Sequence, residues 1–443
     1  MDDRDTHAAA YPAGITLLVL ALLAIGAVMA ASTSTDLDQP LVQRNLWQTP
    51  FGRHLLLIGL SVLVLFGTAR VTQWWLGAGT GARLGSALLL SLVTVAGLAA
   101  VWLPGIGVDH HGARRWIRLG TDAMGLAFQP SELAKPALIL ALAAVLGRSA
   151  QGARTLLRGF APAAAIVTVF VVLIGVEDFG TAVLLAAVGG LTLVAGGCRV
   201  WHCVAAAGPG LATLAYLLVS EPYRVRRLTA FLDVFADPQG AGYHPIQSLA
   251  AIVSGGWFGL GVGNGLQKHG FLPEARSDFV FSVICEETGV FGGVGVIFLY
   301  AALAYLGLTV MRFAATRTGQ LIAFSATLLI TLQASLNIAV ATVSAPTKGI
   351  PLPMISAGGT GMVCLCACAG LLLAVLREWG YPHDWTHGPG PERRTARTRG
   401  STRGGLCRRR QRRSSLPRPV GGLRDARRLS RVAFRFLRVG TGH

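Results

Sequence analysis

Long apolar runs, each separated from the next by a polar segment, follow one another along the first 380 residues of the chain. Each run approaches the roughly 17 to 25 residues that an α-helix needs to cross a bilayer. The pattern therefore predicts an all-α polytopic membrane protein with about ten transmembrane helices, in which a large loop joins helices 7 and 8. The predicted helices cover residues 14–32, 54–74, 84–103, 132–148, 160–177, 179–197, 201–219, 279–311, 320–343 and 357–377.

The composition agrees with a place in the membrane. Only 14% of the 443 residues are charged and the mean hydropathy is +0.55, whereas soluble domains carry roughly 25% charged residues. The small residues 30–32 at the end of the first apolar run would also suit a cleaved signal peptide. The leader before that run is acidic and many spans follow it, so we interpret the run as an uncleaved first helix.

The composition changes abruptly near Pro382. The remainder of the chain holds 17 arginines against three acidic residues, which supplies +14 of the net charge of +18. Its Gly, Pro and Ser content favours disorder, although arginines and apolar residues alternate near its end in a spacing that also suits a helix on anionic lipid. We therefore divide the chain into a membrane domain, residues 1–380, and an Arg-rich cytoplasmic tail, residues 381–443. Nothing resembling a nucleic-acid-binding module accompanies the arginines, so binding to nucleic acid is not expected.

A cytoplasmic tail and an even number of helices place both chain ends in the cytoplasm. The loops at 33–53, 104–131, 178, 220–278 and 344–356 then face outwards, and the short inward loops carry arginines, as such loops usually do. Clusters of cations on the outward loops indicate an anionic partner there. All three lysines of the chain, Lys135, Lys268 and Lys348, lie on this side, and the other 36 basic residues are arginine. We interpret the lysines as positions that need a compact point charge, chance placement being the alternative.

Four outward segments combine polar residues with glycine and proline. In the first, Pro130 and Ser131 begin a helix, and Glu132 lies three residues before Lys135, so their side chains share one helix face. Charges at this depth need a partner or a wet cavity, which leaves a structural ion pair and a substrate cleft as alternatives. The candidate binding residues of this segment are Arg115, Trp116, Gln129, Ser131, Glu132 and Lys135.

The second segment is the hairpin 177–181, which carries Asp178 at its tip. A turn at the membrane edge explains an acidic residue and a glycine as well as a functional role does. Asp178 is therefore a candidate with two open interpretations.

The third segment is the long loop 223–278. Residues 247–268 are apolar but too short and too rich in glycine to span the membrane, so we expect them to dip into it from one side, buried by protein. Their spacing is not that of a dinucleotide-binding motif, whereas exposed backbone N–H groups there could cradle a phosphate. Gln247, Lys268 and Asp278 are the candidate residues. Asp278 directly precedes the eighth helix, where a simple helix N-cap is the competing interpretation.

The fourth segment, residues 346–356, contains three prolines that enforce an irregular path. It presents Lys348 from a turn and ends at Ser356, and both are candidate binding residues. A rigid turn alone would not need the lysine.

Taken together and in this order, the four segments resemble the FtsW/RodA/SpoVE family of cell-wall polymerases over residues 14–377. The motif Pro346-Thr-Lys-Gly349 is more similar to the division-type members than to the elongation-type members. The resemblance implies polymerisation of lipid II on the outer face of the bacterial cytoplasmic membrane during cell division. It further implies a class B penicillin-binding protein transpeptidase and other division-complex membrane proteins as partners. Asp278 matches the family's essential acidic residue, and Trp116, Glu132 and Lys135 match other important positions.

The residue types suit this chemistry. We expect Asp278 to activate the acceptor hydroxyl for an inverting attack, with Arg115, Lys135, Lys268 and Lys348 neutralising the pyrophosphate and Trp116 packing on sugar or lipid. No cofactor is required, and a divalent cation stays an open alternative. The seven cysteines predict neither a metal site nor a disulfide framework. The competing functions are a lipid II flippase or transporter, an elongation polymerase, and a scaffold of the division complex.

Overall fold

The computed structural model describes residues 3–34, 49–103, 106–110, 113–119 and 126–377. A helix coincides with each of the ten predicted spans, which confirms the predicted fold class. These helices are α1 (Asp3–Ser34), α2 (Pro50–Gly77), α3 (Thr80–Ala100), α4 (Pro130–Leu146), α6 (Ala161–Glu177), α7 (Phe179–Ala195), α8 (Val200–Val219), α11 (Val280–Phe313), α12 (Arg317–Ala341) and α13 (Gly359–Arg377). The predicted Arg-rich tail lies outside the described residues.

Eight helical stretches in the described ranges are long and apolar enough to cross a membrane. Helix α7 is apolar but has only 17 residues, and α4, of equal length, carries two charged side chains. Among the eight spans, 78% of the residues in the most apolar stretch of α13 are buried inside the protein, compared with 6% of those in α8. Helix α13 therefore lies in the centre of the bundle and α8 at its edge. The exposed leucines, valines and phenylalanines of the outer helices suit contact with lipid.

Close backbone contact holds the central helices together. Helix α13 packs along α2, and a Cβ atom added to Gly370 would lie 2.4 Å from the carbonyl oxygen of Leu65. Only glycine permits this approach, which is a usual way of packing helices in membranes. Helix α13, the last in the described residues, also contacts α12 and α4. It therefore connects helices from the beginning, the middle and the end of the membrane domain.

A three-stranded antiparallel sheet occupies the segment that we predicted as a plain outward loop. Its strands β1 (Gly107–His110), β2 (Ala113–Leu119) and β3 (Leu126–Phe128) pair in the order β1-β2-β3, with Ile117 opposite both Gly107 and Phe128. The prediction missed this sheet because the strands are short and mix charged with apolar residues. The sheet contacts α4 and α6, and it places Arg115 and Trp116 on the central strand.

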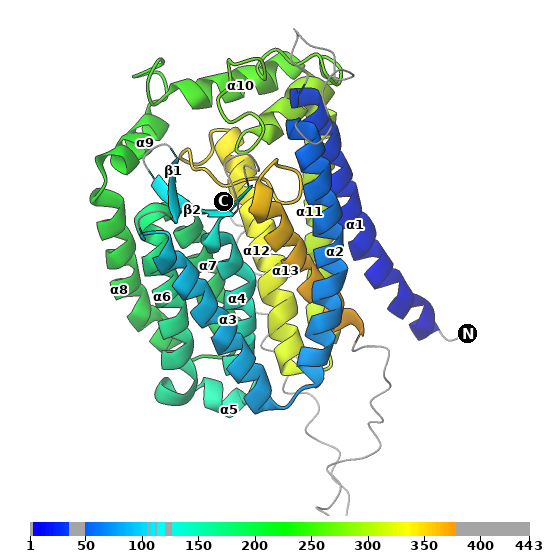
Figure 1. Ribbon diagram of the computed structural model, residues 1–443, viewed down its shortest axis with the longest axis vertical. Coiled ribbons are helices and arrows are strands. Elements are labelled where there is room, and N and C mark those ends of the chain that lie inside the picture. The colour runs from blue at the N-terminus through cyan, green and yellow to red at the C-terminus, as the bar shows by residue number, and fades with distance from the viewer. Residues whose placement is uncertain (1–2, 35–48, 104–105, 111–112, 120–125, 378–443) are drawn as a thin grey trace, which may run out of the picture. The chain divides into compact units, whose positions relative to one another are not determined.

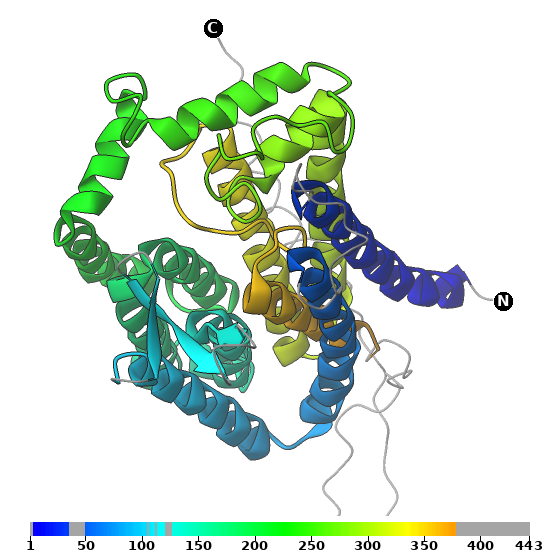
Figure 2. The same cartoon turned by 45° about the horizontal axis from the view of Figure 1, so that its top comes forward.

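The irregular segments gather at one end of the helices, which we call the loop end (Figure 1). Here lie the sheet, the short helices α9 (Pro222–Leu232) and α10 (Tyr243–Gly255), and the loops 256–279 and 342–358. Figure 2, which brings this end forward, shows α10 lying across the helix ends rather than along them. The opposite end carries α5 (Ala150–Ala153) and the π-helical turn η3 (Leu156–Phe160).

The glycine-rich loop 256–261 packs against a break in α11. Helix α11 is interrupted at Gly289, where φ is 72° and ψ is −172°. The backbone N–H groups of Val290 and Phe291 donate to carbonyls of the loop, and loop N–H groups donate back to the carbonyls of Glu286 and Glu287 at 3.0 and 2.9 Å. The loop thus supplies hydrogen bonds that the helix loses at its break.

The expectation that protein would bury the whole glycine-rich segment is wrong for its aromatic side chains. Trp257 and Phe258 are 67% and 83% exposed. The glycines bring one side of the backbone against α11, so the side chains between them are left on the outer side of the loop. The segment is therefore a surface loop with one packed side.

Candidate active site

Asp278 ends the long loop, and the proline-rich loop 342–358 holds it in place. The side-chain amide of Asn337 on α12 donates to the carbonyl of Asp278 at 2.7 Å and to the carbonyl of Ile350 at 2.8 Å. Asn337 is 1% exposed, and each of its two N–H groups has a partner. One buried amide therefore joins the start of α11 to the proline-rich loop.

Ser356 makes a second connection between the same two loops. Its hydroxyl donates to the carbonyl of Ser277 at 2.5 Å and accepts from the N–H of Leu352 at 2.7 Å. The N–H of Ala357 donates to the carbonyl of Arg276 at 3.0 Å. Ser356, a predicted binding residue, thus fixes the backbone directly before Asp278.

The carboxyl group of Asp278 lies in a half-buried, partly acidic environment. Burial, Glu274 and Asp178 together raise the pKa of Asp278 from 3.8 to about 7, and Arg227 and Arg115 act in the opposite direction. Helix α11 begins with Phe279 as its N-cap, so the simple capping role considered for Asp278 is not observed. A carboxyl group whose pKa lies near neutral pH suits proton transfer.

The proline-rich loop approaches this carboxyl group closely through glycine. A Cβ atom added to Gly349 would lie 3.1 Å from Oδ2 of Asp278. Larger side chains would press on the carboxylate, which explains why Lys348 is followed by glycine.

Asp178 and Lys348 lie on the neighbouring side of the site. Asp178 caps α7, accepting from the N–H of Thr181 at 3.1 Å and from its hydroxyl at 2.8 Å, so its side chain has a structural role in this turn. Lys348 Nζ lies 5.0 Å from the ring centroid of Phe179. Burial lowers the pKa of Lys348 and the nearby Asp178 carboxylate counteracts this effect. Asp178 thus combines a helix cap with electrostatic contact to Lys348 and Asp278.

Two arginines complete the positive side of the site. Arg115 on β2 has a buried Nε atom without a hydrogen-bond partner, and Arg227 on α9 donates to the carbonyl of Thr347 at 3.4 Å while its guanidinium stacks 4.4 Å from the ring of Tyr223. Arg227 was not among the predicted site residues. The available signal was its membership of the outward cation cluster, which does not tell one arginine from another.

Glu132 and Lys135 form the predicted pair on one face of α4, at 2.6 Å. Both residues are buried, with exposures of 3% and 1%. A Cβ atom added to Gly361 would lie 3.2 Å from Glu132 Oε2, so the pair lies between α4 and α13. Its geometry fits the structural interpretation, in which each charge offsets the burial of the other.

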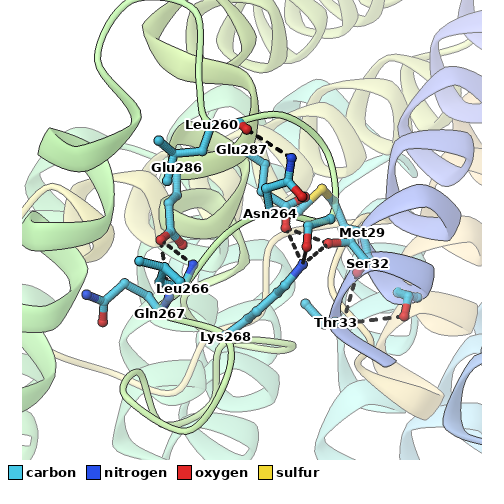
Figure 3. Close-up of polar contacts among 12 residues, drawn as sticks. Met29, Ser32, Thr33, Leu260, Asn264, Leu266, Gln267, Lys268, Glu286 and Glu287 are labelled. Atoms are coloured by element: carbon cyan, nitrogen blue, oxygen red, sulfur yellow. Dashed lines mark hydrogen bonds and ion pairs between the residues drawn. The ribbon is translucent and has the colours of Figure 1, made fainter. Parts of the chain in front are cut away.

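Lys268 lies in a different group, between α1 and α11 (Figure 3). Its ammonium group donates to Glu287 Oε1 at 2.7 Å, to Ser32 Oγ at 2.8 Å and to the carbonyl of Gly263 at 2.7 Å. The contacts observed for Lys268 therefore differ from those of Lys348, whose ammonium group lies over the ring of Phe179.

The other predicted binding residues also lie in segments of the loop end. Trp116 is half-buried on β2, Gln247 is half-buried on α10, and Ser131 is buried in the first turn of α4. Gln129 precedes α4, and its backbone N–H donates to Thr360 Oγ1 at 3.4 Å. Their roles stay predictions.

Other features of the described residues lie away from this site. A surface cavity at the opposite end of the helices is lined by Gln151, Arg154, Thr155, Leu156, Arg199 and His202. In the described ranges, no group of three or more His, Cys, Asp or Glu side chains has the geometry of a metal site.

Comparison with known proteins places the chain. The family model described as "Cell cycle protein", FtsW/RodA/SpoVE, matches residues 13–380. The chain belongs to this family. It is 38% identical over 370 residues to the probable peptidoglycan glycosyltransferase FtsW of Thioalkalivibrio sulfidiphilus, covering 82% of this chain and 89% of that protein. It is 33% identical to the stage V sporulation protein E of Bacillus subtilis, covering 83% and 97%.

Solved structures give the same result for the fold. A chain from a peptidoglycan synthase complex described as coordinating polymerisation and crosslinking is similar with a TM-score of 0.64 and 27% identity, covering 83% of this chain and 98% of that chain. The rod shape determining protein RodA of Thermus thermophilus is similar with a TM-score of 0.57 and 26% identity, covering 83% and 97%. This chain is thus a multi-pass membrane protein of the FtsW/RodA/SpoVE family.

Proposed function

We propose that this protein is a peptidoglycan glycosyltransferase that polymerises lipid II into glycan strands for the wall made at cell division. The observation that carries the proposal is the position of Asp278, a carboxyl group with a pKa near 7 that lies beside Arg115 and Arg227 and against Gly349, the residue after Lys348. Related proteins with this activity in their names match more than 80% of the chain. The membrane domain, residues 1–380, would be the catalytic unit, and residues 381–443 an Arg-rich cytoplasmic tail.

Asp278 would act as the general base. At neutral pH a carboxyl group with a pKa of about 7 is ionised in a large fraction of molecules and still binds a proton well. It would accept the proton of the 4-hydroxyl of the acceptor's N-acetylglucosamine while that oxygen attacks the anomeric carbon of the donor. The bond between this carbon and the pyrophosphate oxygen breaks, and the configuration at the carbon inverts.

The cations of the site would stabilise the departing undecaprenyl pyrophosphate. Arg115 and Arg227 present guanidinium groups, which bind phosphate oxygens through paired N–H groups. Lys348 adds a point charge, and its lowered pKa comes from burial, which also strengthens its attraction for an anion. Positive charges fixed before the reaction cost no reorganisation when the negative charge develops.

The location and partners follow from the same proposal. The loop end would face outwards from the bacterial cytoplasmic membrane, where lipid II is consumed. A class B penicillin-binding protein transpeptidase would be the partner, as the similarity to a chain of a peptidoglycan synthase complex suggests. Other division-complex membrane proteins would assemble beside it.

A lipid II flippase or transporter is the second candidate, and an elongation polymerase is a variant of the first. A transporter would place its charged groups at the membrane midplane between broken helices. Here Asp278, Lys348 and Arg115 lie together in loops and strands at one end of the helices. This distribution favours a surface reaction over transport.

A gel assay of lipid II polymerisation tests the proposal. Purified wild-type protein in proteoliposomes, with and without the partner transpeptidase, should produce glycan strands, and Asp278→Asn should reduce the rate by at least about 100-fold. Asp233→Asn, which neutralises an exposed carboxylate of the same long loop, is the matched control. Polymerisation by Asp278→Asn at a rate near wild type would rule out the assigned base, and lipid II transport without polymerisation would favour the flippase.

A further inference from the structure

The last turn of α1 holds two residues of the segment that leads to Asp278. Lys268 donates to the hydroxyl of Ser32, and the guanidinium of Arg276 donates to the carbonyl of Thr33. Both cations therefore lie at the C-terminal end of α1, where free carbonyls and the helix dipole favour positive charge. The segment 268–276 is therefore hydrogen-bonded through its first and last residues to the C-terminus of α1.

Lys268 has no donor left for a substrate. An ammonium group has three N–H bonds, and Glu287, Ser32 and the carbonyl of Gly263 accept all three at 2.7 to 2.8 Å. The Lys268 side chain is 1% exposed and that of Glu287 is fully buried. A pyrophosphate could reach this lysine only if the ion pair separated.

The same group holds the first turns of α11. The hydroxyl of Ser32 donates to Glu287 Oε1 at 2.5 Å, and Glu286 Oε1 accepts the N–H groups of Leu266 and Gln267 at 2.7 and 3.1 Å. Figure 3 shows these contacts joining α1, the glycine-rich loop and α11. The break at Gly289 separates residues 280–288 from the rest of α11, so these turns depend on lateral contacts for their position.

These turns begin two residues after Asp278. We propose that Lys268 is a positioning residue. Through Glu287 and Ser32 it holds the loop and the first turns of α11 against the end of α1, and it thereby sets the position of the Asp278 carboxyl group. This inference rests on the proposed polymerase function. It gives Lys268 a role different from the neutralisation of pyrophosphate that its sequence motif suggests.

Paired substitutions of Lys268 and Glu287 distinguish the two roles. Lys268→Met leaves a buried carboxylate without its cation, whereas the double variant Lys268→Met/Glu287→Gln removes both charges and keeps an acceptor for Ser32. We expect kcat for lipid II polymerisation to fall about 10-fold or more in Lys268→Met with KM unchanged, and to return to within about threefold of wild type in the double variant. Arg158→Met, an exposed cation at the opposite end, is the control.

A direct role in binding predicts the reverse pattern. If Lys268 contacts the pyrophosphate, KM rises in Lys268→Met and the double variant is no more active than the single one, which overturns the inference. Lys268→Arg adds a test should Lys268→Met not fold. A guanidinium keeps its affinity for phosphate but does not fit the three-acceptor arrangement, so positioning predicts lower kcat at constant KM, and binding predicts nearly normal kinetics.

The melting temperatures of the same variants separate failure of this inference from failure of the proposed function. Without any substrate, Glu287→Gln should restore part of the stability that Lys268→Met loses. Additive losses would refute the coupling even if the wild type polymerises lipid II. A wild type that does not polymerise lipid II would refute the function and leave the coupling measurable.

Discussion

Replacing Asp278 by asparagine should stabilise the protein while it abolishes polymerisation. The pKa of this carboxyl group is raised from 3.8 to about 7, so the folded protein binds its proton more tightly than the unfolded chain does. Stability contributed by that proton is complete below pH 4 and is lost as the pH rises to 7. At about 1.4 kcal/mol per pKa unit, this shift means that ionising the side chain lowers the free energy of unfolding by about 4 kcal/mol. This value is an upper limit, because solvent still reaches the carboxyl group and screens its interactions.

Asparagine keeps the shape of the side chain but does not titrate. The melting temperature of Asp278→Asn should therefore exceed that of wild type by an amount that grows between pH 5 and pH 8, where about 3 of the 4 kcal/mol develop. Intrinsic fluorescence during heating of detergent-purified protein measures it, with Asp233→Asn as the exposed control. A melting-temperature difference that stays constant or shrinks with rising pH would refute the assigned environment of Asp278.

Three further substitutions test other contacts of the site and its support. Lys348→Met should slow polymerisation at least about 10-fold in the gel assay, with Lys348→Arg intermediate because the cation over Phe179 persists. Asn337→Leu leaves two carbonyls without donors and should lower stability by about 2 to 4 kcal/mol in a thermal melt, and an unchanged melt would contradict the joint it forms. Gly259→Ala places a Cβ 2.1 Å from a carbonyl at a φ of 79° and should abolish recovery of folded protein by size-exclusion chromatography, whereas Gly190→Ala, which meets open space, should be recovered normally.

The chain's hydrophobic pattern was sufficient to predict all eight helical stretches of the described residues that are long and apolar enough to cross a membrane. A bilayer forces each crossing backbone to satisfy its own hydrogen bonds, so apolar runs of sufficient length must be helices. The pairing of Glu132 with Lys135 followed from the same regularity, because residues three apart share a helix face. Both predictions depended only on local spacing.

The sheet and the contacts of the lysines did not follow from local spacing. The strands β1 to β3 are too short for a periodic signal, and the sheet that they form contacts α4, α6 and α13, which lie elsewhere in the sequence. Lys268 and Lys348 share an outward position and a glycine or proline context in the sequence. Tertiary packing gave Lys268 three hydrogen-bond acceptors and Lys348 an aromatic ring.

The sequence by itself determined that this chain is a multi-pass, all-α membrane protein, and it singled out Asp278 through its motif. Only the tertiary structure decided which cations face that carboxyl group, bringing Arg227 from α9 and Arg115 from the sheet to it and holding Lys268 at the end of α1. The physical reason is that membrane insertion depends on the composition of each segment separately. A polar site instead depends on contacts between segments that lie far apart in the sequence, such as the end of α1 at Ser32 and the loop at Lys268, 236 residues later.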